Sequence, residues 1–365
     1  MPERIRYLIC PDSFKGSLTA QEAAQAMCEG VLEGDDFAIT KCLPLADGGE
    51  GTADILGNSL KGKKIEVRCV DALEREVKSV YYIIEEENPY AIIDVASAIG
   101  LALIPEHERD IMKSTSKGAG LLVADAYRRG IRKFIIGLGG SATCDGGRGM
   151  LSAMRNAGID IITSGNNKHI DITVLCDVEN PFSGKDGAAF VFAPQKGATS
   201  AQVSLLDKEL VRWAAEMKEL GGLDISNVKG VGAAGGIAGM LASLYGARLV
   251  SGINCVLDIL DFNSEINKAD YILTGEGRID SQTLHGKTLS GVLERVKNNA
   301  GQNGLIPKVV AFCGSVTERK TLSAYFHDLI EIKPSNMPVE QAMLKSVAYD
   351  NLKSAVCKFI KDQVL

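Results

Sequence analysis

The chain has 365 residues, of which 45% are hydrophobic and 24% are charged, and its formal net charge is −6. This composition is typical of a globular protein and excludes global disorder, and the length favours two domains. The mild acidity disfavours a nucleic-acid binder, because such proteins depend on a large basic surface.

The nine cysteines are scattered without a C-x-x-C pair, and the four histidines are dispersed. This distribution is typical of free thiols in a reducing compartment and does not indicate a disulfide framework or a zinc site. The N-terminus reaches a Pro-Asp turn after a short apolar run, which does not fit a signal peptide. No apolar run approaches the roughly 18 residues of a membrane span. We therefore expect a soluble cytoplasmic protein without a membrane partner.

The N-terminal part of the chain has the rhythm of a parallel α/β sheet. Residues 5–10 form a short apolar run that predicts a buried strand. Thr19 and Glu22 form a capping box that predicts the start of a helix. A second strand is predicted over residues 37–43, followed by a glycine-rich turn and a short helix that ends near Leu60. Strands that alternate with helices in this way open a parallel sheet.

The middle of the chain differs, because three predicted strands follow one another without a helix between them. These strands are predicted over residues 64–70, 76–85 and 90–95. The elements predicted after them are a helix over residues 116–129, a strand over 133–137, a helix ending near Ala157, strands over 170–176 and 189–193, and a helix over 200–220. The change of pattern predicts a separate domain with a mixed sheet.

The alternation of strands and helices returns after about residue 252. Strands are predicted over residues 269–274, 308–313 and 329–332, and helices over 288–298 and 338–365. We therefore predict an α/β fold in which residues 1–61 and 255–365 form a flavodoxin-like, doubly wound parallel sheet. Residues 62–254 are predicted to form an inserted second α/β domain with a mixed sheet.

Three glycine-rich turns also carry acidic residues, over residues 47–51, 137–149 and 275–280. A turn of this kind exposes several backbone N–H groups and forms an anion site, most often for phosphate. The alternative is that the glycines only make tight turns. An acid beside such a site repels a bare phosphate, so these acids suggest a metal ion or a substrate hydroxyl.

Lys15 lies in the loop between the first strand and the capped helix. The helix macrodipole disfavours a cation at this end of a helix, so we expect Lys15 to have an anionic partner, a phosphate or a carboxylate. An exposed loop lysine is the alternative. Ser13 and Ser17 flank Lys15 either as anion ligands or as turn and cap residues.

Other functions remain open on the residues alone. Gly137, Gly139 and Ala142 fit the G-x-G-x-x-A dinucleotide fingerprint after a predicted strand, but outside the N-terminal β-α-β unit. The alternatives are an NAD-dependent oxidoreductase acting on a small hydroxy acid, a non-catalytic protein that binds an organic acid, and a kinase of another short hydroxy acid.

Four motifs, in this order along the chain, resemble the bacterial glycerate kinase family of class II, the glycerate 2-kinase type. The motifs are Pro11-Asp-Ser-Phe-Lys-Gly-Ser17, Pro44-Leu-Ala-Asp-Gly-Gly-Glu-Gly-Thr52, Gly137-Leu-Gly-Gly-Ser-Ala-Thr-Cys-Asp-Gly-Gly and Leu273-Thr-Gly-Glu-Gly-Arg-Ile-Asp280. The resemblance implies ATP-dependent phosphorylation of D-glycerate, usually at the 2-hydroxyl, which feeds glycolysis. It also implies ATP and Mg²⁺ as cofactors, and an active site in a cleft between a flavodoxin-like domain and an inserted domain. A homodimer stays open.

Phosphoryl transfer to glycerate needs positioning, charge neutralisation and help for the attacking hydroxyl. We expect Lys15 to bind the glycerate carboxylate or the transferring phosphate. Asp47 is expected to orient or deprotonate the hydroxyl, unless it only caps a helix. Asp280 is expected to act as a second catalytic acid or, with Glu276, to bind Mg²⁺. The remaining candidates for substrate or phosphate binding are Ser13, Ser17, Gly48, Gly49, Ser141, Thr143, Asp145 and Arg278.

Overall fold

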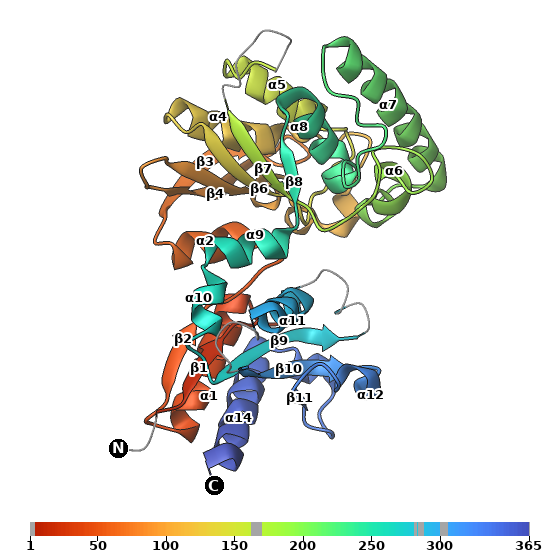
Figure 1. Cartoon of the computed structure of the whole chain (residues 1–365). Helices are drawn as coiled ribbons and strands as arrows, with labels where there is room; N and C mark the ends of the chain where they lie inside the picture. Colours follow the sequence, from red (N-terminus) through yellow and green to blue (C-terminus); the bar gives the residue numbers. More distant parts are fainter. Residues whose placement is uncertain (1–3, 162–169, 281–282, 284–287, 300–305, 365) are drawn as a thin grey trace. The chain divides into compact units, whose positions relative to one another are not determined.

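The structure, a computed structural model, describes residues 4–161, 170–280, 283, 288–299 and 306–364 (Figure 1). The chain divides into two compact units. The outer unit comprises Met1–Asp47 and Ile253–Leu365, and the inserted unit comprises Gly48–Gly252. The sequence predicted the first boundary after residue 61, whereas the structure groups residues 48–61 with the inserted unit. No helix within the described ranges is long and apolar enough to cross a membrane.

The outer unit is built on a five-stranded sheet in the order β11-β10-β9-β1-β2, and every neighbouring pair is parallel. Its strands are β1 (Arg6–Ile9), β2 (Ile39–Cys42), β9 (Tyr271–Ile279), β10 (Lys308–Val316) and β11 (Asp328–Glu331). Counted within this unit, the order is 2-1-3-4-5, which is the flavodoxin-like order. The predicted fold of this unit is confirmed.

Helix α1 (Ala20–Gly34) begins at Thr19, which forms the predicted capping box with Glu22. Its face with Met27 and Val31 is buried against the sheet core. The long C-terminal helix α14 (Lys345–Val364) packs along α1 (Figure 1). The other helices of this unit are α9 (Gly252–Ile259), α10 (Phe262–Ile266), α11 (Thr288–Asn299), α12 (Arg319–Leu322) and α13 (Val339–Ala342).

The inserted unit is built on a six-stranded mixed sheet in the order β3-β4-β5-β6-β7-β8. The first two pairs are antiparallel and the remaining three are parallel. Its strands are β3 (Lys63–Val70), β4 (Glu76–Ile84), β5 (Tyr90–Asp94), β6 (Lys133–Gly137), β7 (Asp171–Leu175) and β8 (Arg248–Val250). The predicted mixed sheet is confirmed.

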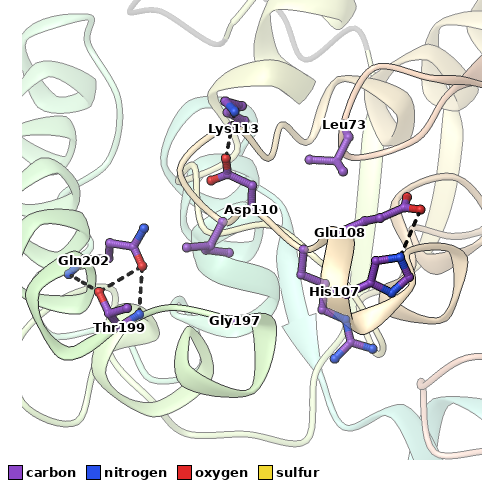
Figure 2. A pocket seen from close by; sticks show the side chains of 10 residues that line it. Leu73, His107, Glu108, Asp110, Lys113, Gly197, Thr199 and Gln202 are labelled. Atoms are coloured by element: carbon purple, nitrogen blue, oxygen red, sulfur yellow. Dashed lines mark hydrogen bonds and ion pairs between the residues drawn. The ribbon is translucent and has the colours of Figure 1, made fainter.

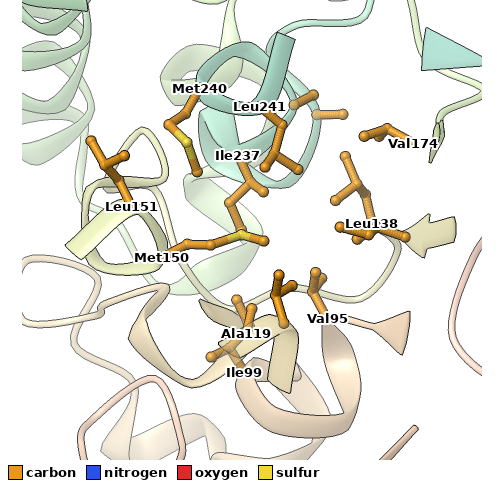
Figure 3. Packing of buried hydrophobic residues seen from close by; sticks show 14 of the residues in the cluster. Val95, Ile99, Ala119, Leu138, Met150, Leu151, Val174, Ile237, Met240 and Leu241 are labelled. Carbon is orange, nitrogen blue, oxygen red and sulfur yellow. The ribbon is translucent and has the colours of Figure 1, made fainter. Parts of the chain in front are cut away.

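Helices cover the mixed sheet and enclose a core in which Val95, Ile99, Met150, Ile237 and Leu241 are buried (Figure 3). The helices are α2 (Thr52–Ser59), α3 (Ala96–Ile99), α4 (Lys117–Arg128), α5 (Arg148–Asn156), α6 (Ala188–Phe192), α7 (Ser200–Glu219) and α8 (Ile237–Tyr245). Helix α2 packs on β4 and β5, which is why it belongs to this unit and not to the outer one.

One predicted strand is wrong. The segment predicted as a strand over residues 189–193 forms helix α6, in which the N–H of Val191 donates to the Gly187 carbonyl at 3.1 Å. The burial does not alternate as in a half-buried strand, because Ala188 and Ala189 are buried while Phe190 and Val191 are both exposed. The place beside β7 in the sheet is taken by β8.

Candidate active site

Three of the four sequence motifs lie at neighbouring strands of the outer sheet. The first follows β1, the second follows β2 and the fourth lies in β9 and just beyond it. The loops also bond to one another: the N–H of Asp12 donates to the Gly275 carbonyl at 2.8 Å, and the N–H of Leu45 donates to the Pro11 carbonyl at 2.9 Å. In open α/β sheets the carboxyl ends of the strands form the ligand-binding edge, so the motifs share the expected place.

The loop that carries Lys15 packs directly on β9 at Gly277. A Cβ atom at position 277 would lie 3.2 Å from the backbone nitrogen of Lys15, so the absent side chain allows the close approach. Gly16 makes the following turn with a positive φ of 78°, a conformation that favours glycine. Lys15 is therefore held beside the backbone between Glu276 and Arg278.

Two polar side chains of the Lys15 loop have no protein partner within the described part of the chain. The ammonium group of Lys15 is exposed and forms no ion pair there. The Ser17 hydroxyl is buried and finds no hydrogen-bond partner among the same residues. Buried polar groups are normally hydrogen-bonded, so this loop fits a place where an anion completes the bonding. Ser13 is exposed, and its N–H donates to Asp12 Oδ1 at 2.5 Å.

Asp12, for which the sequence predicted no role, is a carboxylate of this edge with a raised pKa. Burial raises the pKa of its carboxyl, the hydroxyl of Thr288 at the start of α11 donates to Oδ2 and lowers it, and the charge of Asp47 raises it further. Its position directly after a buried strand, three residues before Lys15, was the signal in the sequence. The structure therefore places two acids, Asp12 and Asp47, at the ends of adjacent strands.

Glu276 and Arg278 alternate along β9 and so share one face of the strand, and Asp280 directly follows the strand in the same alternation. Arg278 Nε lies 3.4 Å from Asp280 Oδ2. At the usual rise of a strand, Glu276 and Asp280 are about 13 Å apart, more than a single Mg²⁺ bridges.

In the inserted unit the turn after Asp47 meets the third motif. A Cβ atom at Gly139 would lie 2.4 Å from the Cα atom of Gly49, so the two turns are in backbone contact. Asp94, at the end of β5, accepts hydrogen bonds from the N–H groups of Gly51 and Ala53, each at 3.0 Å. The cap of helix α2 is thus supplied by Asp94, which the sequence analysis did not identify.

Ser141 and Thr143 are buried, and the side chain that joins them is Lys196. Its Nζ donates to Ser141 Oγ at 3.1 Å and to the Thr143 carbonyl at 2.7 Å. Lys196 is 4% exposed, and burial lowers the pKa of its ammonium group to about 8. It stands in a short Pro-Gln-Lys turn, more than fifty residues from both partners, and nothing in the sequence pattern marked it.

The Asp145 carboxylate is held by hydrogen bonds within the inserted unit. Its carboxylate accepts from the N–H and hydroxyl of Ser116 and from the N–H groups of Gly147 and Gly149, at 2.8 to 3.1 Å. These contacts hold the starts of helices α4 and α5 together. Helix α5 begins only at Arg148, so Gly137–Ala142 does not open a helix as a dinucleotide fingerprint does.

A cavity of about 610 Å³ lies elsewhere in the inserted unit, and none of the candidate residues lines it (Figure 2). Its charged lining is largely paired: Lys113 bonds Asp110 at 3.0 Å, and His107 lies 3.7 Å from Glu108. Within the described ranges no group of three or more His, Cys, Asp or Glu side chains could hold a metal ion. His169 and His285 lie outside those ranges.

Comparison with known proteins gives one consistent result. The model of the Glycerate kinase family matches residues 7–167 and 157–362. A glycerate kinase of Bacillus subtilis (strain 168) is 36% identical over 94% of each chain, and a glycerate 2-kinase of Escherichia coli (strain K12) is 36% identical over 86% of this chain and of its own. A crystal structure described as a glycerate kinase 2 from Salmonella typhimurium LT2 superposes with a TM-score of 0.81 at 33% identity, covering 99% of both chains.

Proposed function

This chain belongs to the glycerate kinase family and phosphorylates glycerate, and we propose that it transfers the terminal phosphoryl group of ATP to the 2-hydroxyl of D-glycerate. The product is then 2-phospho-D-glycerate, which feeds glycolysis in the cytoplasm. The name of the relative from Escherichia coli, a glycerate 2-kinase, supports the choice of hydroxyl.

The observation that carries this proposal is the convergence of three motifs at one edge of the outer sheet. Lys15 is an exposed cation of that edge, and we assign it to the glycerate carboxylate or to the transferring phosphate, with Ser13 and Ser17 beside it. Asp47 is assigned to the attacking hydroxyl, which it orients and deprotonates. Arg278 is assigned to neutralise charge on the phosphate, and Asp280 is assigned as a second catalytic acid.

The acids of this edge fit a magnesium ion. Asp12 is a largely buried carboxylate beside a second one, so a cation there offsets both the repulsion and the loss of hydration. Mg²⁺ usually takes one or two carboxylates together with phosphate oxygens and water. We assign it to Asp12 with Glu276, whose neighbour Gly275 accepts the Asp12 N–H. When bound, the ion neutralises charge on the phosphate oxygens.

We further propose that two turns of the inserted unit contribute to binding of nucleotide or substrate. These are the turn of Gly48 and Gly49 and the turn of Ser141 and Thr143. Their support is the backbone contact between the two turns, which the absence of a side chain at Gly139 allows. Asp145 is assigned a supporting role in the same turn.

The experiment is a coupled assay of ADP release with D-glycerate, L-glycerate and glycolate as acceptors. We expect turnover that requires ATP and is fastest with D-glycerate, with NMR of the product showing phosphate on the 2-hydroxyl. Phosphate on the 3-hydroxyl would contradict the proposed regiochemistry. A faster reaction with glycolate would contradict the substrate, and glycerate-dependent reduction of NAD⁺ without ADP release would contradict the reaction.

A further inference from the structure

Asp94 is a buried carboxylate to which the proposed reaction gives no role. It is the last residue of β5 and is 5% exposed. Oδ2 accepts hydrogen bonds from the N–H groups of Gly51 and Ala53, each at 3.0 Å. Oδ1 is equally buried and has no hydrogen-bond partner among the residues that the structure describes. Burying an acid with one oxygen unpaired costs free energy, which makes Asp94 a candidate for a functional role.

The two N–H groups that donate hydrogen bonds to Asp94 belong to the start of helix α2. The N-cap residue of that helix is Gly51, which has a positive φ of 92° and no side chain that could cap the helix. Asp94 supplies the missing acceptor from another strand, and a negative charge at this end of a helix is favoured by the macrodipole. The turn from Gly48 to Gly51 therefore depends on Asp94 for its geometry.

Asp94 also touches the second glycine turn. A Cβ atom at Gly137 would lie 2.5 Å from Asp94 Oδ1 and 3.1 Å from the Gly48 carbonyl. The carboxylate thus stands between the turn that directly follows Asp47 in the chain and the turn that begins at Gly137. A substitution of this side chain is therefore expected to alter the geometry of both turns.

Two acidic side chains act on Asp94. Asp54 on α2 and Glu50 in the turn before it both raise the pKa of the Asp94 carboxyl. Asp54 also forms an ion pair with Lys64, whose Nζ lies 3.7 Å from Oδ1, and the residue opposite Asp94 on β6 is Gly137. Burial is the largest cause, and the pKa reaches about 7. The two backbone hydrogen bonds oppose the shift, because they favour the ionised form.

We propose that Asp94 is a positioning residue for phosphoryl transfer: it fixes the turn that follows Asp47, and it releases this turn when it takes up a proton. The inference rests on the proposed function, because it assigns Asp47 to the attacking hydroxyl. A carboxylate accepts hydrogen bonds more strongly than a protonated carboxyl does. The turn is therefore held most firmly above neutral pH.

The test measures kcat, and KM for glycerate and for ATP, between pH 5.5 and 8.5 in the wild type, Asp94→Asn and Asp54→Asn. In the wild type we expect kcat to rise with pH through about 7. Asparagine has the shape of aspartate but not its charge, so in Asp94→Asn kcat is expected to fall at least about tenfold at pH 8 and to lose this rise with pH.

Asp54→Asn is the matched control. Asp54 is a half-exposed acid that accepts from the Tyr82 hydroxyl at 2.7 Å, a bond that asparagine can keep. Removing its charge lowers the pKa of Asp94, so the rise of kcat is expected at lower pH with the same maximum. Thermal unfolding of each variant checks that it is folded.

Two results would overturn the inference. One is an Asp94→Asn enzyme with the kcat and pH profile of the wild type. The other is an Asp54→Asn profile that does not move, and this readout remains available if Asp94→Asn fails to fold. A wild-type protein without ATP-dependent turnover of glycerate overturns the proposed function instead, so the two failures are distinguishable.

Discussion

Asp12 and Asp47 follow adjacent parallel strands, and the charge of Asp47 adds to burial in raising the pKa of the Asp12 carboxyl. Two acids in this arrangement repel each other, and each stands in a motif that also contains glycine or lysine. A bound cation and a phosphate together would balance the charges at this edge, because the cation neutralises the two acids and Lys15 binds the phosphate.

Removal of Mg²⁺ by a chelator is expected to abolish ADP release, and added Mg²⁺ to restore it. In Asp12→Asn the Mg²⁺ concentration for half-maximal activity is expected to rise by about tenfold or more, because one ligand loses its charge. The measurement is a Mg²⁺ titration of the initial rate at fixed ATP. An unchanged half-maximal concentration would remove Asp12 from the metal site.

Lys15→Met is expected to lower kcat/KM by about 10², because the anion loses its charged donor. Lys41→Met is the control, since Lys41 is an exposed lysine on β2 of the same unit and has no assigned role. Steady-state kinetics with D-glycerate and ATP varied in turn show which of the two substrates Lys15 binds. Equal kcat/KM values for Lys15→Met and the control would contradict the assignment.

The free energy of unfolding is expected to depend on pH through Lys196. Burial lowers the pKa of its ammonium group from 10.5 to about 8, so between these values the unfolded chain binds more protons than the folded one. The free energy of unfolding contributed by Lys196 therefore rises with pH across this window, by about 3 kcal/mol in total. Relative to Lys196→Met, the wild type is expected to gain stability between pH 7.5 and 10.5.

Denaturant unfolding of the wild type and Lys196→Met at several pH values in this window measures the difference. Other lysines contribute equally to both proteins and cancel. A difference that stays constant with pH would show that Lys196 titrates normally in the folded protein.

Asp145→Ala is expected to destabilise the protein by about 3 kcal/mol, because the donors from Ser116, Gly147 and Gly149 lose their acceptor. Well below its unfolding temperature, the variant is expected to keep KM values for both substrates close to those of the wild type. Thermal and denaturant unfolding measure the first effect, and steady-state kinetics the second. A large rise in KM without loss of stability would instead place Asp145 in direct contact with a ligand.

Much of the fold could be predicted from the sequence because its signals are local. The capping box of Thr19 and Glu22 and the apolar run before Pro11 each lie within a few residues. The alternation of strands and helices at both chain ends predicted a parallel sheet, for which a flavodoxin-like order was the expectation. Helix α6 was missed because its short apolar run has the length and composition of a strand, and only its packing against α7 decides otherwise.

The site was predictable only where chemistry was concentrated in a motif. Lys15 and Asp47 stand in glycine-rich motifs, which drew attention to them. Asp94 and Lys196 are single charged residues, and their partners are 41 to 55 positions away in the chain. Pattern alone cannot show that such a residue is buried, because the burial follows from how the sheet brings distant turns together.

The most direct test of the central claim, that the edge of the outer sheet performs the phosphoryl transfer, is the kcat of Asp47→Asn with ATP and D-glycerate. The matched control is Asp36→Asn, an exposed aspartate in the turn before β2. We predict a loss of about 10² or more in kcat for Asp47→Asn and none for Asp36→Asn, because only the former removes the group that accepts the proton of the hydroxyl. A folded Asp47→Asn enzyme that turns over at the rate of the control would contradict the account.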